Sequence, residues 1–135
     1  AAPISGRSRP KQLLMQQTYK IVVAHEYPIV RLDICAALGQ VGRYEVVAES
    51  SDPAETLQMV GSCHPQLLIL DSRLGGIATP NWLDFLRRTE PQMKVLLLAE
   101  LAASVPPGVA GVVGKSEPVH RLIQTVESIE SAQRG

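Results

Sequence analysis

The stretch that decides the fold runs from residue 67 to residue 76 and reads LLILDSRLGG. The apolar run at residues 67–70, bounded by His64-Pro65 before it and Gly75-Gly76 after it, predicts a short strand that is buried on both faces. Asp71 stands at the carboxyl end of this strand, the edge at which open α/β sheets place ligands and chemistry. An aspartate after a strand often only caps a loop, so Asp71 needs partners before it indicates a site.

Three further apolar segments are expected to end at the same edge of the sheet, and two of them are followed by charged residues. Residues 21–24 precede His25-Glu26, residues 95–98 precede Ala99, and residues 109–113 lead to Lys115. Because the carboxyl ends of parallel strands meet at one edge of the sheet, Glu26, Asp71 and Lys115 are expected to form a compact charged site. The alternative for Lys115 is a loop lysine in solvent.

The rest of the chain alternates between strand and helix patterns. Strands are predicted over residues 20–24, 44–48, 66–70, 94–99 and 109–113, and helices are predicted to begin near Pro28, Pro53, Pro80 and Pro118, because proline suits the first turn of a helix. This alternation predicts an α/β fold, a five-stranded parallel sheet with helices on both faces. In the flavodoxin-like strand order 2-1-3-4-5, the ends of the first and third strands are neighbours, which places Glu26 next to Asp71.

One connection is too short for this pattern. Only residues 100–108, which include Pro106-Pro107, join the fourth and fifth strands. A parallel crossover with its helix needs about 10–12 residues. We therefore expect the fourth helix to be short or missing.

Composition indicates one domain over residues 19–135, preceded by a flexible tail over residues 1–18. The chain has 135 residues, of which 45% are hydrophobic and 19% charged, which argues against disorder. Its formal net charge of zero argues against DNA binding by this segment alone. No stretch approaches the ~20 apolar residues of a membrane span, no secretory signal is visible, and Cys35 and Cys63 are interpreted as reduced thiols of a cytoplasmic protein.

These motifs together resemble the receiver domain of bacterial response regulators (CheY-like), and most of all the LuxR/NarL-type regulators. The resemblance covers roughly residues 19 to 132. It rests on HEYPIVR at residues 25–31, on LILDSRLGG at residues 68–76 and on Gly114-Lys115.

The resemblance implies a role in two-component signal transduction rather than in catalysis of its own. Asp71 would be the phosphoacceptor, and Lys115 would pair with it. Glu26, Asp71 and the backbone carbonyl of Arg73 would bind Mg²⁺. A sensor histidine kinase would be the partner, and the domain would regulate an attached DNA-binding output domain.

The sequence departs from the family pattern at three switch positions. His25 replaces the first acid of the acid pair, Ala99 replaces the hydroxyl residue after the fourth strand, and Val112 stands at the aromatic switch position. Mg²⁺ binding is therefore expected to be weak or absent, since imidazole is a poor ligand for a hard ion. We expect the neighbouring carboxylates to raise the pKa of His25, so that its charge replaces part of the missing metal.

Two alternatives stay open. The domain could be a phosphorylation-independent pseudo-receiver that acts as a dimerisation or docking module. A flavodoxin-like flavin binder is the other, although the carboxylate in the loop after the first strand would repel a phosphate. If the missing helix leaves an apolar surface exposed, we expect a homodimer through residues 100–132, unless the 100–108 loop covers it. That surface would comprise Val109, Val112, Val119, Leu122, Ile123, Val126 and Ile129.

Overall fold

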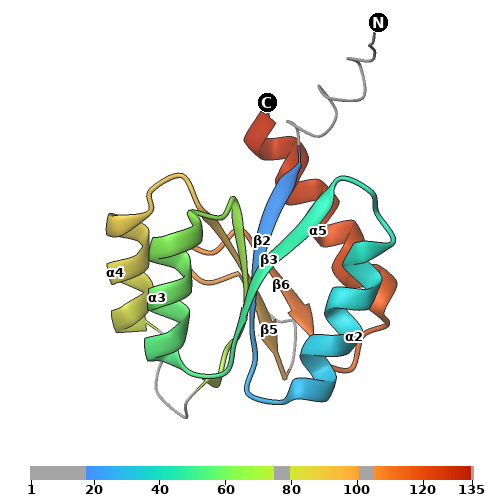
Figure 1. Ribbon diagram of the computed structural model, residues 1–135, viewed down its shortest axis with the longest axis horizontal. Coiled ribbons are helices and arrows are strands. Elements are labelled where there is room, and N and C mark those ends of the chain that lie inside the picture. Colours follow the sequence, from blue (N-terminus) through green and yellow to red (C-terminus); the bar gives the residue numbers. More distant parts are fainter. Residues whose placement is uncertain (1–17, 75–79, 101–104, 135) are drawn as a thin grey trace, which may run out of the picture.

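A five-stranded parallel sheet forms the centre of the protein (Figure 1). The computed structural model describes residues 18–74, 80–100 and 105–134. The strands are β2 (Tyr19–Ala24), β3 (Tyr44–Ser50), β4 (Leu67–Asp71), β5 (Lys94–Ala99) and β6 (Gly111–Gly114). Their order in the sheet is β3-β2-β4-β5-β6. The predicted fold class and the order 2-1-3-4-5 are confirmed.

Four helices cover the sheet within the described part of the chain. They are α2 (Pro28–Gly39), α3 (Pro53–Cys63), α4 (Pro80–Thr89) and α5 (Val119–Arg134). Figure 1 shows α3 and α4 on one face of the sheet and α2 and α5 on the other. Asp52 caps α3, because its side chain accepts a hydrogen bond from the backbone N–H of Glu55 at 2.8 Å.

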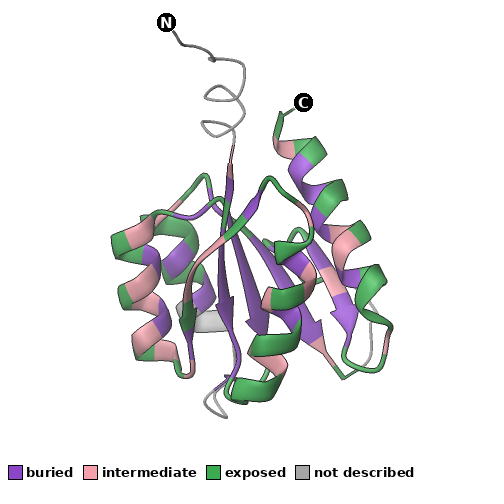
Figure 2. Ribbon diagram, turned by 45° about the vertical axis from the view of Figure 1, so that its right-hand side comes forward, coloured by how far each residue is buried: buried purple, intermediate pink, exposed green. Residues whose placement is uncertain are grey.

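Each face of the sheet carries its own core, and the strands β2, β4 and β5 between them are largely buried, whereas the edge strand β3 is mostly half-buried or exposed (Figure 2). On one face, Ile34 and Leu38 of α2 pack with Leu122 and Val126 of α5 over the sheet. On the other face, Val60 of α3 and Leu86 of α4 belong to a second buried cluster. The first four residues of β4, Leu67–Leu70, are fully buried, as the apolar run predicts.

The connection from β5 to β6 has no helix in its described part, residues 100 and 105–110. The expectation that the helix between the fourth and fifth strands is short or missing is confirmed for these residues. Residues 101–104 lie outside the described part. The strand β6 begins at Gly111, two residues later than predicted. Val109 instead belongs to a loop that closes over the sheet, where only 8% of it is exposed.

The expectation of an exposed apolar surface over residues 100–132 is wrong. Leu122, Val126 and Ile129 are buried, because α2 packs against α5 and both lie on the sheet. Only Val119, at the first turn of α5, is exposed. Val109 is buried on the other face of the sheet, with α3 and α4, and residues 101–104 lie outside the described part, so covering by the 100–108 loop stays a prediction.

Residues 1–17 of the predicted tail lie outside the described residues. Within the described ranges, no helix is long and apolar enough to cross a membrane.

Candidate functional site

Asp71 is the last residue of β4 and lies at the carboxyl edge of the sheet. Its side chain is only 3% exposed. The backbone N–H of Arg73 donates a hydrogen bond to Asp71 Oδ1 at 3.2 Å. The predicted position of this carboxylate is confirmed, and a buried acid of this kind needs a charged or hydrogen-bonding partner.

Lys115 supplies that partner. Its Nζ atom lies 2.7 Å from Asp71 Oδ1 and 3.5 Å from Oε1 of Glu100. The backbone N–H of Lys115 donates to the carbonyl of Ala99 at 2.7 Å, so the chain is fixed where it leaves β6. The structure therefore brings Asp71 and Lys115 together, as predicted, and adds Glu100 as a second acid on the same ammonium group.

His25 lies on the other side of the carboxylate. Its Nε2 atom is 3.6 Å from Asp71 Oδ2, too far for a hydrogen bond. Its Nδ1 atom accepts the backbone N–H of Tyr27 at 3.1 Å, and its carbonyl accepts Arg31 Nη1 at 2.6 Å. Because Nδ1 is an acceptor, this hydrogen-bond pattern assigns a neutral imidazole with its proton on Nε2.

The expected rise in the pKa of His25 is wrong. Burial lowers the pKa, and the carboxylate of Asp71, which raises it, does not compensate. Lys115 lowers it further. A buried ring beside one carboxylate that already has an ammonium partner gains little from a positive charge. His25 therefore does not replace the charge of a metal ion.

The remaining predicted site residues lie farther from the carboxylate or make no contact with it. Glu26 is exposed and forms no ion pair with any described residue. Ala99 ends β5 and carries no hydroxyl, and Val112 in β6 is half-buried against the core on the α3 and α4 face. No described contact uses the backbone carbonyl of Arg73.

These residues do not form a preorganised site for Mg²⁺ within the described part of the chain. Nowhere in the described ranges do three His, Cys, Asp or Glu side chains converge as metal ligands. The single buried carboxylate is paired with Lys115 at 2.7 Å, and the position next to it carries a neutral imidazole instead of an oxygen ligand.

Sequence reasoning missed the residues that hold His25 and Lys115. Arg31 reaches back from α2 to the His25 carbonyl and also pairs with Glu49 of β3, with Nε 3.2 Å from Oε1. The sequence signal that could have indicated the role of Arg31 is its position in the HEYPIVR motif, six residues after His25. The site also adjoins a cavity of about 340 Å³ between α2 and the start of α5, which His25 and Lys115 both line.

No family model matches the sequence. A curated relative is the response regulator GacA of Pseudomonas aeruginosa, which is 22% identical over 121 residues. The match covers 85% of this chain and 56% of GacA, so the chain spans little more than half the length of that relative.

Solved structures of response regulators share the fold. RcsB from Salmonella enterica serovar Typhimurium, bound to the promoter rprA with the phosphomimetic BeF₃⁻, aligns with a TM-score of 0.77 and 20% identity. That alignment covers 84% of this chain and 61% of RcsB. The signal receiver domain of NarL from Mycobacterium tuberculosis aligns with a TM-score of 0.71 and 23% identity, over 88% of this chain and 98% of that one.

Proposed function

We propose that this chain, which has the fold of a response-regulator receiver domain, accepts a phosphoryl group on Asp71 in two-component signalling. The observation that carries the proposal is the ion pair between Lys115 Nζ and Asp71 Oδ1 at 2.7 Å. It lies at the carboxyl edge of the sheet, where such folds place their chemistry. The domain is a phosphoacceptor, not an enzyme with a substrate of its own.

The geometry favours Oδ2 of Asp71 as the attacking atom. Oδ1 already accepts Lys115 and the Arg73 N–H, whereas Oδ2 faces only the more distant His25 ring. Oδ2 would form a bond to phosphorus while the bond from phosphorus to the donor breaks, which leaves an acyl phosphate and the released donor group. Lys115 would then neutralise a phosphoryl oxygen. A sensor histidine kinase is the donor that belongs to this proposal.

Weak Mg²⁺ binding is part of the proposal. The candidate ligands are Glu26, Asp71 and the Arg73 carbonyl. The exposed side chain of Glu26 and the Lys115–Asp71 pair both argue for low affinity.

The output of the domain is proposed to be transcription, through a DNA-binding domain of the same protein in the cytoplasm. Support comes from the RcsB structure that is bound to the promoter rprA, of which the alignment with this chain covers 61%. The zero net charge of this chain argues that DNA contacts are made elsewhere.

Acetyl phosphate labelling tests the proposal directly. Intact-mass spectrometry after incubation with acetyl phosphate and excess Mg²⁺ should show one phosphoryl group on the wild type and none on Asp71→Asn. Asp84→Asn, which removes an exposed carboxylate on α4, is the matched control and should label like the wild type. Absence of labelling on the wild type, with a positive receiver measured in parallel, would refute the phosphoacceptor role.

A phosphorylation-independent docking module is the second candidate. The observation in its favour is that Asp71 is buried and already neutralised by Lys115, while Ala99 offers no hydroxyl to a phosphoryl group. Its partner could be a second copy of the chain, because the exposed apolar side chains include Tyr27, Ile29 and Val119 near α2 and the start of α5. Analytical ultracentrifugation separates the candidates. A dimer that persists in Asp71→Asn and is lost in Ile29→Lys supports the module, and a monomer at all concentrations excludes a second copy of the chain as its partner.

A further inference from the structure

We propose that a basic groove beside α4 binds an acidic segment of a partner protein. The groove has a volume of about 560 Å³ and lies between the last turns of α4, the start of β5 and the loop before β6. Its charged lining residues are Asp84, Arg87, Arg88 and Lys94, and its loop wall includes Gly108 and Ala110. It shares no residue with the Asp71 site, so the inference goes beyond the phosphoacceptor role.

The groove follows from the short connection between β5 and β6. The described part of that connection, residues 100 and 105–110, forms no helix. The described loop residues are held beside β5 at Ala110, whose backbone N–H donates to the Val95 carbonyl at 2.8 Å. The guanidinium group of Arg87 packs against Gly108, since a Cβ atom built there would lie 2.5 Å from Arg87 Nη1. One wall is therefore this loop and the other is the end of α4.

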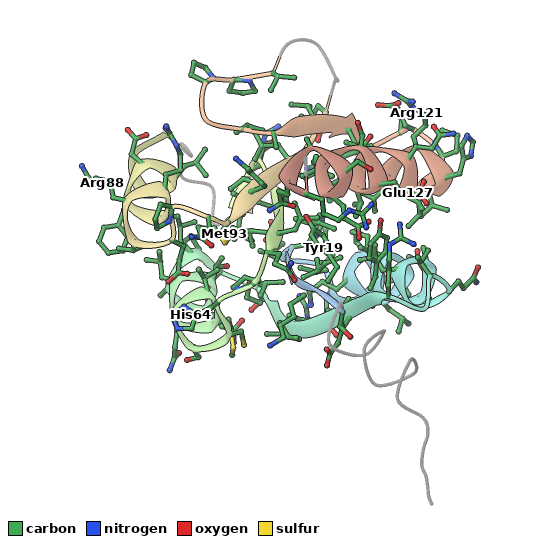
Figure 3. The ribbon with its side chains drawn as sticks, turned by 90° about the horizontal axis from the view of Figure 1, so that it is seen from above. Tyr19, His64, Arg88, Met93, Arg121 and Glu127 are labelled. Carbon is green, nitrogen blue, oxygen red and sulfur yellow. The ribbon has the colours of Figure 1, made fainter. Side chains whose placement is uncertain are left out.

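Charge in the groove is unbalanced. Three cationic side chains line it against one acid, although the whole chain has a net charge of zero. Arg87 pairs with Asp84, with Nη1 3.1 Å from Oδ1. Arg88 and Lys94 form no ion pair with any described residue, and both are exposed. Figure 3 shows Arg88 projecting from α4 away from the sheet. Such a local excess attracts anionic groups.

The shape of the groove favours a protein segment over other anions. None of its cations is buried, so it lacks the enclosed donors that hold a single small anion. Nucleic acid binding needs many cations along one surface, and the neutral chain does not supply them. The apolar side chains of Met93 and Val109 lie at the base, 6% and 8% exposed. A segment with several acidic residues and an apolar one matches this arrangement, with an affinity that falls as salt rises.

A peptide titration tests the inference. The probe is a fluorescein-labelled peptide of Asp, Glu and Leu, followed by fluorescence anisotropy at low and high salt. Arg88→Glu/Lys94→Glu should weaken binding by at least about tenfold. The matched control is Lys20→Glu/Arg134→Glu, which makes the same change in net charge at two exposed cations outside both the groove and the Asp71 site. The control should stay within about twofold of the wild type, and circular dichroism checks that both variants fold.

Three outcomes would overturn the inference. These are no peptide binding at low salt, equal weakening by both double variants, and tighter binding of a short DNA duplex than of the peptide. Asp71→Asn should bind the peptide as the wild type does. This result separates the groove from the phosphoacceptor role, which the labelling experiment tests independently.

Discussion

Lys115 Nζ lies 2.7 Å from Asp71 Oδ1, although Asp71 ends β4, Lys115 follows β6, and β5 lies between these two strands. The two side chains can meet because the parallel register aligns Asp71 with Leu98 and Ala99 with Gly114. The strands β4, β5 and β6 therefore end side by side at the carboxyl edge of the sheet. The Asp71 side chain is only 3% exposed, whereas that of Lys115 is 28% exposed. The lysine therefore compensates a buried charge that would otherwise be costly.

Lys115→Met should lower the free energy of unfolding by about 2 kcal/mol, because it leaves the Asp71 carboxylate buried and without its cation. Asp71→Asn should cost less, since Lys115 keeps Glu100 as a partner and reaches solvent. Urea unfolding of both variants and of the double variant gives a double-mutant cycle. A coupling of about 1 kcal/mol or more is expected, and simple additivity would show that the pair contributes no stability.

His25→Asp should strengthen Mg²⁺ binding by about tenfold or more, because it restores an oxygen ligand beside Asp71 and Glu26. His25→Asn is the matched control, since it removes the ring without adding a charge. Isothermal titration measures both. Wild-type affinity that already equals that of His25→Asp would contradict the proposal that this site binds Mg²⁺ weakly.

The pKa of His25 should lie below its ordinary value of 6.5, because burial disfavours the imidazolium. The unfolded chain then binds a proton at a higher pH than the folded one, so folding stability should fall as the pH drops below about 6.5. An NMR titration of the His25 ring measures the pKa. The loss of stability should be smaller in His25→Gln, and a pKa above 6.5 would contradict the burial argument.

The fold could be predicted from the sequence because its signals are local. Apolar runs such as residues 67–70, and prolines at helix starts such as Pro28 and Pro53, mark element boundaries to within one or two residues. The strand β6 was placed too early, since Val109 is apolar and buried like a strand residue but lies in a loop. Apolar residues of α5 such as Leu122 and Val126 were assigned to an exposed surface, because sequence alone does not show that α2 packs against them.

The site could be predicted only in part. Strand order brought Asp71 and Lys115 together, because strand ends meet at one edge. The direction of the His25 pKa depends on a balance between burial and nearby charges that sequence does not fix. The ion pair with Glu100 and the support from Arg31 depend on loop conformations, and no periodic pattern encodes these.

Gly108→Ala should lower the free energy of unfolding by about 1–2 kcal/mol, because Gly108 has a φ of 83°, which L-residues adopt at a cost. Its new methyl group would also meet the guanidinium of Arg87. Gly42→Ala is the control, as nothing lies within 4 Å of its Cβ position. Thermal unfolding compares the two, and equal effects would exclude a special conformation at Gly108.

The carboxylate of Glu130, at the edge of the sheet opposite the Asp71–Lys115 pair, should also contribute to the stability of the fold. Only 3% of this α5 residue is exposed. Arg43 Nε donates to both carboxylate oxygens, at 3.0 and 2.9 Å, and the Tyr44 hydroxyl donates to Oε1 at 2.8 Å. Burial alone would raise the pKa of Glu130, but the hydrogen bonds from Arg43 and Tyr44 outweigh it and lower the pKa below its ordinary value of 4.5.

A lowered pKa in the folded state means that Glu130 stabilises the fold above about pH 4.5, and that this contribution is lost as the pH falls through the folded-state pKa. Glu130→Gln should therefore cost about 1–2 kcal/mol at neutral pH and progressively less in acid. Glu127→Gln is the matched control on the same helix, since that side chain is 48% exposed and its oxygen lies 3.9 Å from Arg43 Nη2. Urea unfolding at a series of pH values measures both. An equal cost for the two variants, or a cost for Glu130→Gln that does not shrink in acid, would show that the buried pair does not anchor α5 to the sheet.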